Sequence, residues 1–472
     1  MLFSSNEFLF LFLPVSLILY FVVPKRWKNF TLMAVSLVFY GWGEPIYLFL
    51  MIFTIISNYV FGYFVAGAYE RHERKKRVLV ISIVTNLCIL GFFKYADFVL
   101  LNLAKIPLLS GIRPLGISLP IGISFYTFQS MSYVIDVYRG DAKLQKNIIN
   151  FASYVTMFPQ LIAGPIVRYT DIDRELEDRC STVDGCAEGA ERFVCGLAKK
   201  VLLANTAGEL WESIRDIPKG QGGVVLAWIG IACFAAQIYF DFSGYSDMGI
   251  GLGKIFGFRF PENFNYPYTA KSISDFWRRW HITLSTYFKE YVYIPLGGNR
   301  VSRGRLVFNL FVTWSLTGLW HGASWNFIIW GIYYFALLTV EKLFLGKYLE
   351  KMPVFLRHAY TLFFVSVGWL IFAFEDSSAG FEYFKVMFGF GGVPFFTADT
   401  GYEIVRNLLF FAVLCVAATP YPRRFVCRML SEGGRKSTLC HAFLGAGSVA
   451  LFLLCTAYLA DSSYNPFLYF RF

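Results

Sequence analysis

Long apolar runs, separated by short polar stretches, recur from one end of the chain to the other. A membrane-spanning helix needs about 20 mostly apolar residues, and only helices and closed barrels can span a membrane. The pattern therefore predicts an all-α polytopic membrane protein with about 10 to 12 transmembrane helices, forming a single membrane domain over residues 1–472. The expected spans are 8–23, 29–42, 46–66, 78–93, 115–137, 148–166, 224–240, 306–319, 324–340, 360–374, 405–418 and 442–460.

One apolar run, from Leu306 to Val340, is too long to be a single transmembrane helix. Its roughly 35 residues would extend about 50 Å, whereas the hydrocarbon core is about 30 Å thick. We expect the chain to break near Gly318, His321 and Gly322, at the centre of the sequence TGLWHGASW. Broken helices are tolerated at membrane depth where they line a cavity, and an ionisable ring there suggests function. His321 is therefore the first candidate for chemistry.

Composition agrees with a membrane protein, because only 16% of the residues are charged and 56% are hydrophobic. Soluble domains carry about 25% charged residues. The net charge of +11 is concentrated in the short basic runs 25–28, 71–77, 278–279, 300–305 and 423–428. The positive-inside rule assigns such runs to cytoplasmic loops near anionic lipids and not to nucleic-acid binding. Two expected spans separate the first two runs, which places the N-terminus outside if both spans cross.

The segment between Thr170 and Gly222 differs from its surroundings. It begins with the charged stretch DIDRELEDR, and the residues that follow have the spacing of an amphipathic helix that carries Lys199 and Lys200. This pattern predicts a cytoplasmic or interfacial amphipathic insert, residues 170–222, within the membrane domain.

The nine cysteines are scattered and form no CxxC pair. They predict neither a disulfide framework nor a structural zinc site, and no metal site is expected.

The most unusual polar stretch is SISDFWRRWHITLSTYFKEYVYIPLGGNRVSRGR, residues 272–305. On the spacing of one continuous helix, Trp277, Trp280 and His281 share an apolar, aromatic face, and the two arginines of FWRRWH point elsewhere. Two interpretations stay open for His281: a histidine that is merely packed on an amphipathic surface helix, or a second functional histidine.

Further polar groups lie in or beside apolar runs. Asp241 and Ser243 follow a span in QIYFDFSGYSDM, and Gln160 lies in FPQLIAGPIVRY. Hydrogen bonds between helices account for many such residues. The same plain interpretation applies to His321 as a buried histidine bonded to a neighbouring helix. The alternative is functional, because a neutral imidazole with an ordinary pKa of about 6.5 is suited to general-base chemistry.

Several motifs together resemble the membrane-bound O-acyltransferase family, and within it the bacterial alginate O-acetyltransferase branch. They follow one another along nearly the whole chain, and those that contain the two histidines are the most specific. The motifs are LPIGISFYTFQ, FPQLIAGPIVRY, YFDFSGYSDM, FWRRWHITLSTYFKEYVYIPLGGNR, LTGLWHGASWNFIIWG and the terminal YNPFLYFRF. The sequence IPLGGNR favours this branch over the related proteins of teichoic-acid D-alanylation. The chain has Thr317 where the family commonly has glycine, a small departure.

The resemblance implies a ring of transmembrane helices around a tunnel that opens to both faces. It implies that His321 is the catalytic histidine and that His281 is the family's second histidine, near the cytoplasmic entrance. The residues expected to contact the substrates are Trp277, Arg278, Arg279, Trp280, Trp320, Asn326, Asp241, Ser243 and Gln160.

The expected function is acyl transfer, with an acetyl group passing from a cytoplasmic thioester to an exported cell-surface polysaccharide. The donor is expected to be acetyl-coenzyme A or an acyl carrier thioester, with no bound cofactor. Expected partners are membrane lipids and an extracytoplasmic acetyltransferase or relay protein, and the expected location is a bacterial plasma membrane. The alternatives are D-alanyl transfer to teichoic acid, a transporter or flippase for lipid-linked sugars, and an inactive scaffold.

Overall fold

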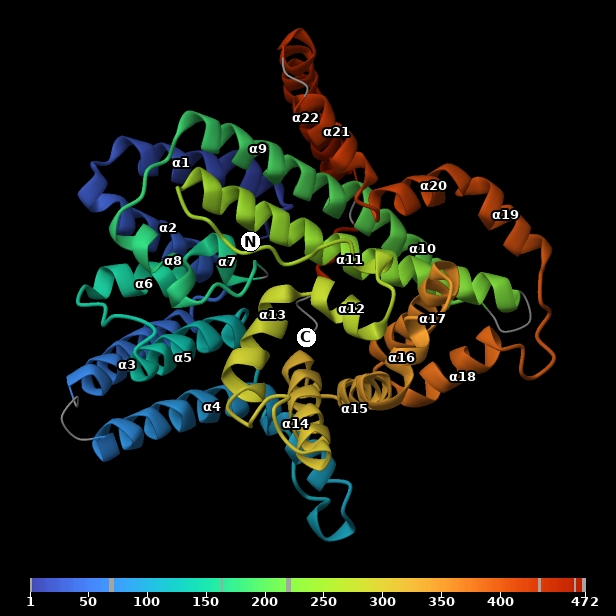
Figure 1. Ribbon diagram of the computed structural model, residues 1–472, viewed down its shortest axis with the longest axis horizontal. Coiled ribbons are helices and arrows are strands. Elements are labelled where there is room, and N and C mark those ends of the chain that lie inside the picture. Colours follow the sequence, from blue (N-terminus) through green and yellow to red (C-terminus); the bar gives the residue numbers. More distant parts are fainter. Residues whose placement is uncertain are drawn as a thin grey trace. The chain divides into compact units, whose positions relative to one another are not determined.

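A computed structural model describes residues 2–67, 72–162, 164–217, 222–431, 434–461 and 464–468, and every regular element in these ranges is a helix (Figure 1). Two expected features reach beyond the described residues: Arg71 of the second basic run, and the last four residues of the YNPFLYFRF motif. Residues 218–221 of the predicted insert lie outside them too.

The chain divides into two compact units. Unit 1 comprises Met1–Phe193 and Tyr245–Pro261, and unit 2 comprises Val194–Gly244 and Glu262–Phe472. Helices α9, Val183–Ala198, and α11, Gly223–Ile255, begin in one unit and end in the other. The single-domain expectation stays a prediction.

The other helices of unit 1 are a π-helix, Phe8–Phe12, that continues into α1, Leu13–Val22, followed by α2 to α8. Their bounds are α2 Lys28–Gly43, α3 Leu48–Gly67, α4 His72–Leu103, α5 Ile123–Arg139, α6 Ile148–Thr156, α7 Phe158–Leu161 and α8 Tyr169–Glu177. Short 3-10 turns lie at Lys25–Trp27 and Pro107–Leu109.

Unit 2 continues from α9 through a π-helical segment, Lys199–Ala204, into α10, Asn205–Arg215. Short helices come next: α12 Ile273–Arg279, α13 Ile282–Phe288 and the π-helix Lys289–Tyr293, with a 3-10 turn before them at Pro267–Thr269. The remaining helices are α14 Arg303–His321, α15 Trp325–Val340, a π-helix Glu341–Leu345, α16 Gly346–Leu349, α17 Val354–Ala373, α18 Ser377–Met387, α19 Ala398–Arg406, α20 Leu408–Ala417, α21 Tyr421–Ser431 and α22 Gly434–Asp461.

The predicted class, an all-α polytopic membrane protein, is confirmed. Six of the described helical segments are long and apolar enough to cross a membrane: Leu48–Gly67, Arg74–Leu103, Gly223–Ile255, Trp325–Leu349, Val354–Ala373 and Leu439–Asp461. A seventh is possible if α19 and α20, which meet at 61°, form one bent span. Most of the other expected spans are shorter or broken helices, whereas α14 has 19 residues but is not among the helices apolar enough to cross. Among the six, α11 has the largest buried share of its most apolar window, 72%.

Two expected spans differ from the observed helices. The span expected at 115–137 becomes helical only at Ile123, after Gly122 adopts a left-handed conformation with φ 74°. The span expected at 148–166 breaks at Met157, between α6 and α7. Pro159 lies in the first turn of α7, where its missing N–H leaves no helical bond unmade, so proline starts a new helix there.

The predicted break in the long apolar run is confirmed, because α14 ends at His321 and α15 begins at Trp325. The two helices cross with their backbones in contact. A Cβ atom added at Gly318 would lie 2.4 Å from the carbonyl oxygen of Phe327, and one at Gly331 would lie 2.6 Å from that of Trp314. Small residues permit such approaches between membrane helices. The crossing fixes where α14 ends.

We expect Gly331→Ala to destabilise unit 2 by about 1–3 kcal/mol, because the new methyl group overlaps the backbone of α14. The control is Gly304→Ala on α14, where the added methyl group would meet open space. Thermal unfolding in detergent should show a lower melting temperature for Gly331→Ala alone. Equal melting temperatures would contradict the close crossing.

Candidate functional site

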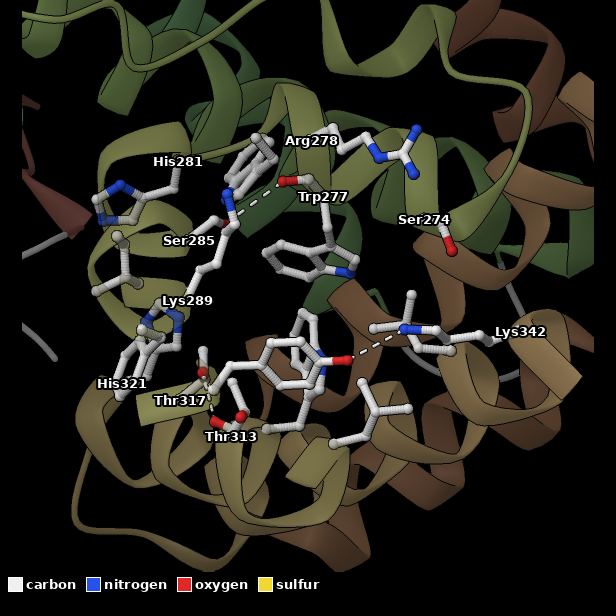
Figure 2. Close-up of a pocket in the computed structure, with 17 residues that line it drawn as sticks. Ser274, Trp277, Arg278, His281, Ser285, Lys289, Thr313, Thr317, His321 and Lys342 are labelled. Atoms are coloured by element: carbon white, nitrogen blue, oxygen red, sulfur yellow. Dashed lines mark hydrogen bonds between the residues drawn. The ribbon is translucent and has the colours of Figure 1, made fainter. Parts of the chain in front are cut away.

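Unit 2 contains a cavity of about 310 Å³ whose walls come from α12, α13, α14 and α15 and from the segments that follow α13 and α15 (Figure 2). His281 and His321, which lie 40 positions apart in the sequence, both line it. Much of the remaining wall is aromatic or aliphatic, and Ser285, Thr313 and Thr317 add hydroxyl groups. The structure thus brings the two candidate histidines to one chamber.

His321 is the last residue of α14, and only 6% of its surface is exposed. Aromatic rings meet it edge to face: the centroids of Trp320, Trp330 and Phe372 lie 5.1, 4.9 and 5.4 Å from that of the imidazole. A Cβ atom at Gly322 would lie 2.3 Å from the ring of Phe327, so only glycine fits after the histidine. The helix end and the aromatic walls together fix the position of the imidazole.

His281 does not lie within a continuous helix, and that prediction was wrong. Helix α12 ends at Arg279, α13 begins at Ile282, and His281 between them has a left-handed backbone with φ 43°. A non-glycine residue in this conformation is uncommon, and such strain often occurs at functional sites. The helical spacing of the aromatic residues concealed the break, because both short helices satisfy it separately.

The environment of His281 keeps its imidazole neutral. The side chain is 1% exposed, and its ring lies edge to face against Phe242 at 4.6 Å and Trp320 at 5.8 Å between centroids. Burial, and to a lesser extent the neighbouring His321, lower the pKa of His281 well below its usual range. The ring is therefore uncharged at neutral pH and can accept a proton only weakly.

Three cations line the cavity with the histidines: Arg278, Lys289 and Lys342. Lys342, labelled in Figure 2, donates a hydrogen bond to the hydroxyl oxygen of Tyr293 at 3.1 Å, and both residues line the cavity. Among the described residues that line the cavity, none is acidic. This wall therefore favours an anionic group. Arg279, by contrast, lies outside the lining and forms an ion pair with Asp275 at 2.9 Å.

The buried carboxylate of Glu341, which no sequence motif indicates, holds the N-terminus of α12. It accepts hydrogen bonds from the backbone N–H groups of Ile273 and Ser274 at 2.6 and 2.9 Å, and from the Ser274 hydroxyl at 2.8 Å. A carboxylate is stabilised there by the unpaired N–H groups and the helix dipole. The only signal in the sequence is an acidic residue directly after the apolar run that ends at Val340.

Asp241 pairs with Lys200 in the interior, with 2.9 Å between Nζ and the carboxylate. Both side chains are almost fully buried, so Lys200 does not lie on the exposed face expected of an amphipathic surface helix. Asp241 also accepts a hydrogen bond from the backbone N–H of Leu468 at 3.0 Å, and Lys200 donates one to the carbonyl of Pro466. The pair therefore anchors residues 464–468.

Asp241 and Leu468 also border an enclosed hollow of about 20 Å³, together with His321 and Trp280. The other expected contact residues take different positions. Trp277 lines the larger cavity, and Trp280 borders both spaces, whereas Trp320 packs on both imidazole rings.

Besides Arg279 and Trp320, three more expected contact residues line neither space. Ser243 is buried in α11, and Asn326 donates a hydrogen bond to the carbonyl of Phe372 at 3.2 Å, which joins α15 to α17. Gln160 belongs to unit 1, where it donates to the carbonyl of Tyr154. Across the described ranges there is no group of three or more His, Cys, Asp or Glu side chains suited to hold a metal ion.

Comparison with known proteins identifies the family. The sequence profile of the membrane-bound O-acyltransferase family matches residues 145–376, which include both histidines. The chain is 40% identical over 507 residues to the probable alginate O-acetylase AlgI of Azotobacter vinelandii, with all of both chains covered. The chain belongs to the membrane-bound O-acyltransferase family. It is therefore an acyltransferase, and the transporter hypothesis finds no support.

Two further relatives narrow the branch. The probable alginate O-acetylase AlgI of Pseudomonas aeruginosa is 45% identical over 394 residues, covering 83% of this chain and 75% of the relative. The peptidoglycan O-acetyltransferase of Helicobacter pylori is 35% identical over 431 residues, covering 83% and 81%. The resemblance to the alginate O-acetyltransferase branch is thus confirmed.

The left-handed backbone of His281 allows a direct test. Glycine adopts positive φ at little cost, whereas a β-branched residue does not, so His281→Gly should be more stable than His281→Val by about 1–2 kcal/mol. Both variants lack the imidazole, and their difference therefore reports the backbone. Thermal unfolding of the two purified variants measures it. A His281→Val protein as stable as His281→Gly would contradict the conformation.

Proposed function

We propose that this acyltransferase moves an acetyl group from a cytoplasmic thioester to a hydroxyl group of an exported polysaccharide, directly or through a relay protein. One observation carries the proposal: the imidazoles of two histidines, from separate parts of unit 2, line one cavity that also carries three cations. The relatives named as alginate and peptidoglycan O-acetyltransferases support the acetyl group and the polysaccharide acceptor.

In this mechanism His321 is the general base. It accepts the proton of the acceptor hydroxyl while the hydroxyl oxygen attacks the thioester carbonyl carbon. The carbon–sulfur bond then breaks, the thiolate leaves and takes the proton from the imidazolium, and an ester and a free thiol result. The described residues that line the cavity include no cysteine, and the proposed mechanism uses no acyl-cysteine. The tryptophan-rich walls exclude water and protect the thioester.

The donor follows from the charge of the cavity. Arg278, Lys289 and Lys342 suit the phosphate groups of acetyl-coenzyme A or of a carrier protein's phosphopantetheine arm, because ammonium and guanidinium groups bind phosphate through charge-assisted hydrogen bonds. The donor is a substrate, and the mechanism requires no resident cofactor. With a donor in the cytoplasm and an exported acceptor, the enzyme works in the bacterial plasma membrane beside an extracytoplasmic acetyltransferase or relay partner.

The central test removes the imidazole of His321. In a strain that lacks this protein, His321→Ala should restore less than about 1% of the acetyl esters that the wild-type protein restores, because general-base catalysis contributes about 10²–10⁴-fold. Mass spectrometry of the purified cell-surface polysaccharide measures the esters.

His441→Ala serves as the matched control, since His441 is exposed on α22 and should restore wild-type acetylation. Acetyl esters at the wild-type level with His321→Ala would overturn the mechanism. Restored alanyl esters in place of acetyl esters would overturn the proposed acyl group.

The cationic wall is tested by kinetics. Lys342→Gln should raise the KM for acetyl-coenzyme A about 5-fold to 20-fold with little change in kcat, because a phosphate contact remote from the reacting carbonyl contributes to donor binding. Lys347→Gln makes the same charge change five positions further on, at an exposed residue outside the cavity, and should leave the KM unchanged. Equal KM values for both variants would contradict the phosphate assignment.

A further inference from the structure

Asn263 holds the break between α12 and α13, although it lies in the extended segment before both helices. Its side chain is 1% exposed. Its backbone carbonyl accepts a hydrogen bond from the N–H of Ile282 at 2.9 Å. Its side-chain Oδ1 accepts from the Thr283 hydroxyl at 2.9 Å and from the Thr283 N–H at 3.3 Å. Three bonds therefore tie the two residues after His281 to this asparagine.

The same Oδ1 atom lies 3.0 Å from Nδ1 of His281. A backbone N–H can only donate, so the atom that Thr283 N–H approaches is the amide oxygen and not the amide nitrogen. An amide oxygen can only accept, and a neutral imidazole has one N–H and one lone-pair nitrogen. The hydrogen of His281 consequently lies on Nδ1, and Nε2 carries the lone pair.

The orientation of the ring is fixed as well as its tautomer. Phe242 and Trp320 meet the imidazole edge to face, and the left-handed backbone at residue 281 limits where the Cβ atom can point. The hydrogen bond to a carbonyl or carboxylate oxygen decides which nitrogen of a functional histidine reacts. Here Oδ1 of Asn263 holds Thr283, two residues after His281, and also determines which nitrogen of His281 carries the hydrogen.

We propose that Asn263 is a positioning residue that holds His281 as its Nδ1–H tautomer, so that Nε2 acts as a hydrogen-bond acceptor in the acyl-transfer site. The proposal rests on the proposed function and assigns His281 a partner class: an O–H or N–H donor, such as the acceptor hydroxyl or an amide of the pantetheine arm. In this role His281 does not stabilise an oxyanion through Nε2, because a lone-pair nitrogen cannot donate.

A double-mutant cycle tests whether Asn263 acts through His281. Asn263→Ala should lower kcat at least about 10-fold, the lower end of the effect known for groups that orient metal-bound imidazoles. In a His281→Ala protein the same substitution should lower kcat less than 2-fold, because the group it positions is gone. Acetyl release from acetyl-coenzyme A in membrane vesicles measures both. Additive losses, 10-fold in either background, would overturn the proposal.

Matched variants separate positioning from folding. Asn263→Asp keeps the acceptor oxygen and should retain more activity than Asn263→Leu, which has a similar size and no acceptor. Thr283→Val removes one bond to Oδ1 without touching the His281 bond, and Asn265→Ala changes an exposed asparagine two positions away. Both should keep kcat within about 2-fold of the wild type. A Thr283→Val loss as large as that of Asn263→Leu would mean a structural role and overturn the proposal.

Nitrogen NMR of the histidine-labelled protein reads the tautomer without any enzyme assay, with His281→Gln used to assign the signal. The proposal predicts a protonated Nδ1 and an unprotonated Nε2 in the wild-type protein, and a mixture of tautomers in Asn263→Ala. A protonated Nε2 in the wild-type protein would overturn it. If the wild-type protein transfers no acetyl group, the proposed function fails while this measurement still decides the tautomer.

Discussion

The backbone contact between α14 and α15 is the constraint on which the site depends. Gly318 and Gly331 let the two helices touch, and His321 follows Gly318 by less than one helical turn. If the helices moved apart, the end of α14 and the tight passage at Gly322 would move with them. The aromatic walls around the imidazole also come from these helices and from α17, so the crossing sets both the position and the surroundings of His321.

Much of the membrane architecture could be predicted because its cause is local. An apolar run longer than the bilayer is thick must bend, and glycines on either side of His321 indicate where. The break at His281 could not be predicted in the same way. It depends on hydrogen bonds that Asn263, 18 positions earlier, accepts from His281 and the residues after it. It depends also on Glu341, 60 positions later, which accepts hydrogen bonds from the N-terminus of α12. Neither partner has a motif of its own in the sequence.

The residues expected to contact the substrates also divide into those whose position the sequence indicates and those whose position depends on distant partners. Trp277, Arg278 and Trp280 line the cavity because they lie beside a histidine that lines it. Arg279 is their neighbour, yet its ion pair with Asp275 draws it away. Asn326 and Gln160 looked equally promising as polar residues in apolar runs, but each bonds to a backbone carbonyl. Whether a polar group in a membrane helix meets a substrate or a carbonyl is decided by tertiary packing, which the sequence alone does not display.

The buried Lys200–Asp241 pair has a consequence for the order in which the site is completed. It fastens Leu468, and Leu468 borders the hollow that reaches His321. Residues 464–468 leave the ribosome after α22, the last of the described helices, has been synthesised. The hollow beside the His321 imidazole is therefore completed only after α22 has been made, and a nascent chain whose earlier helices are already in the bilayer still lacks one of its walls.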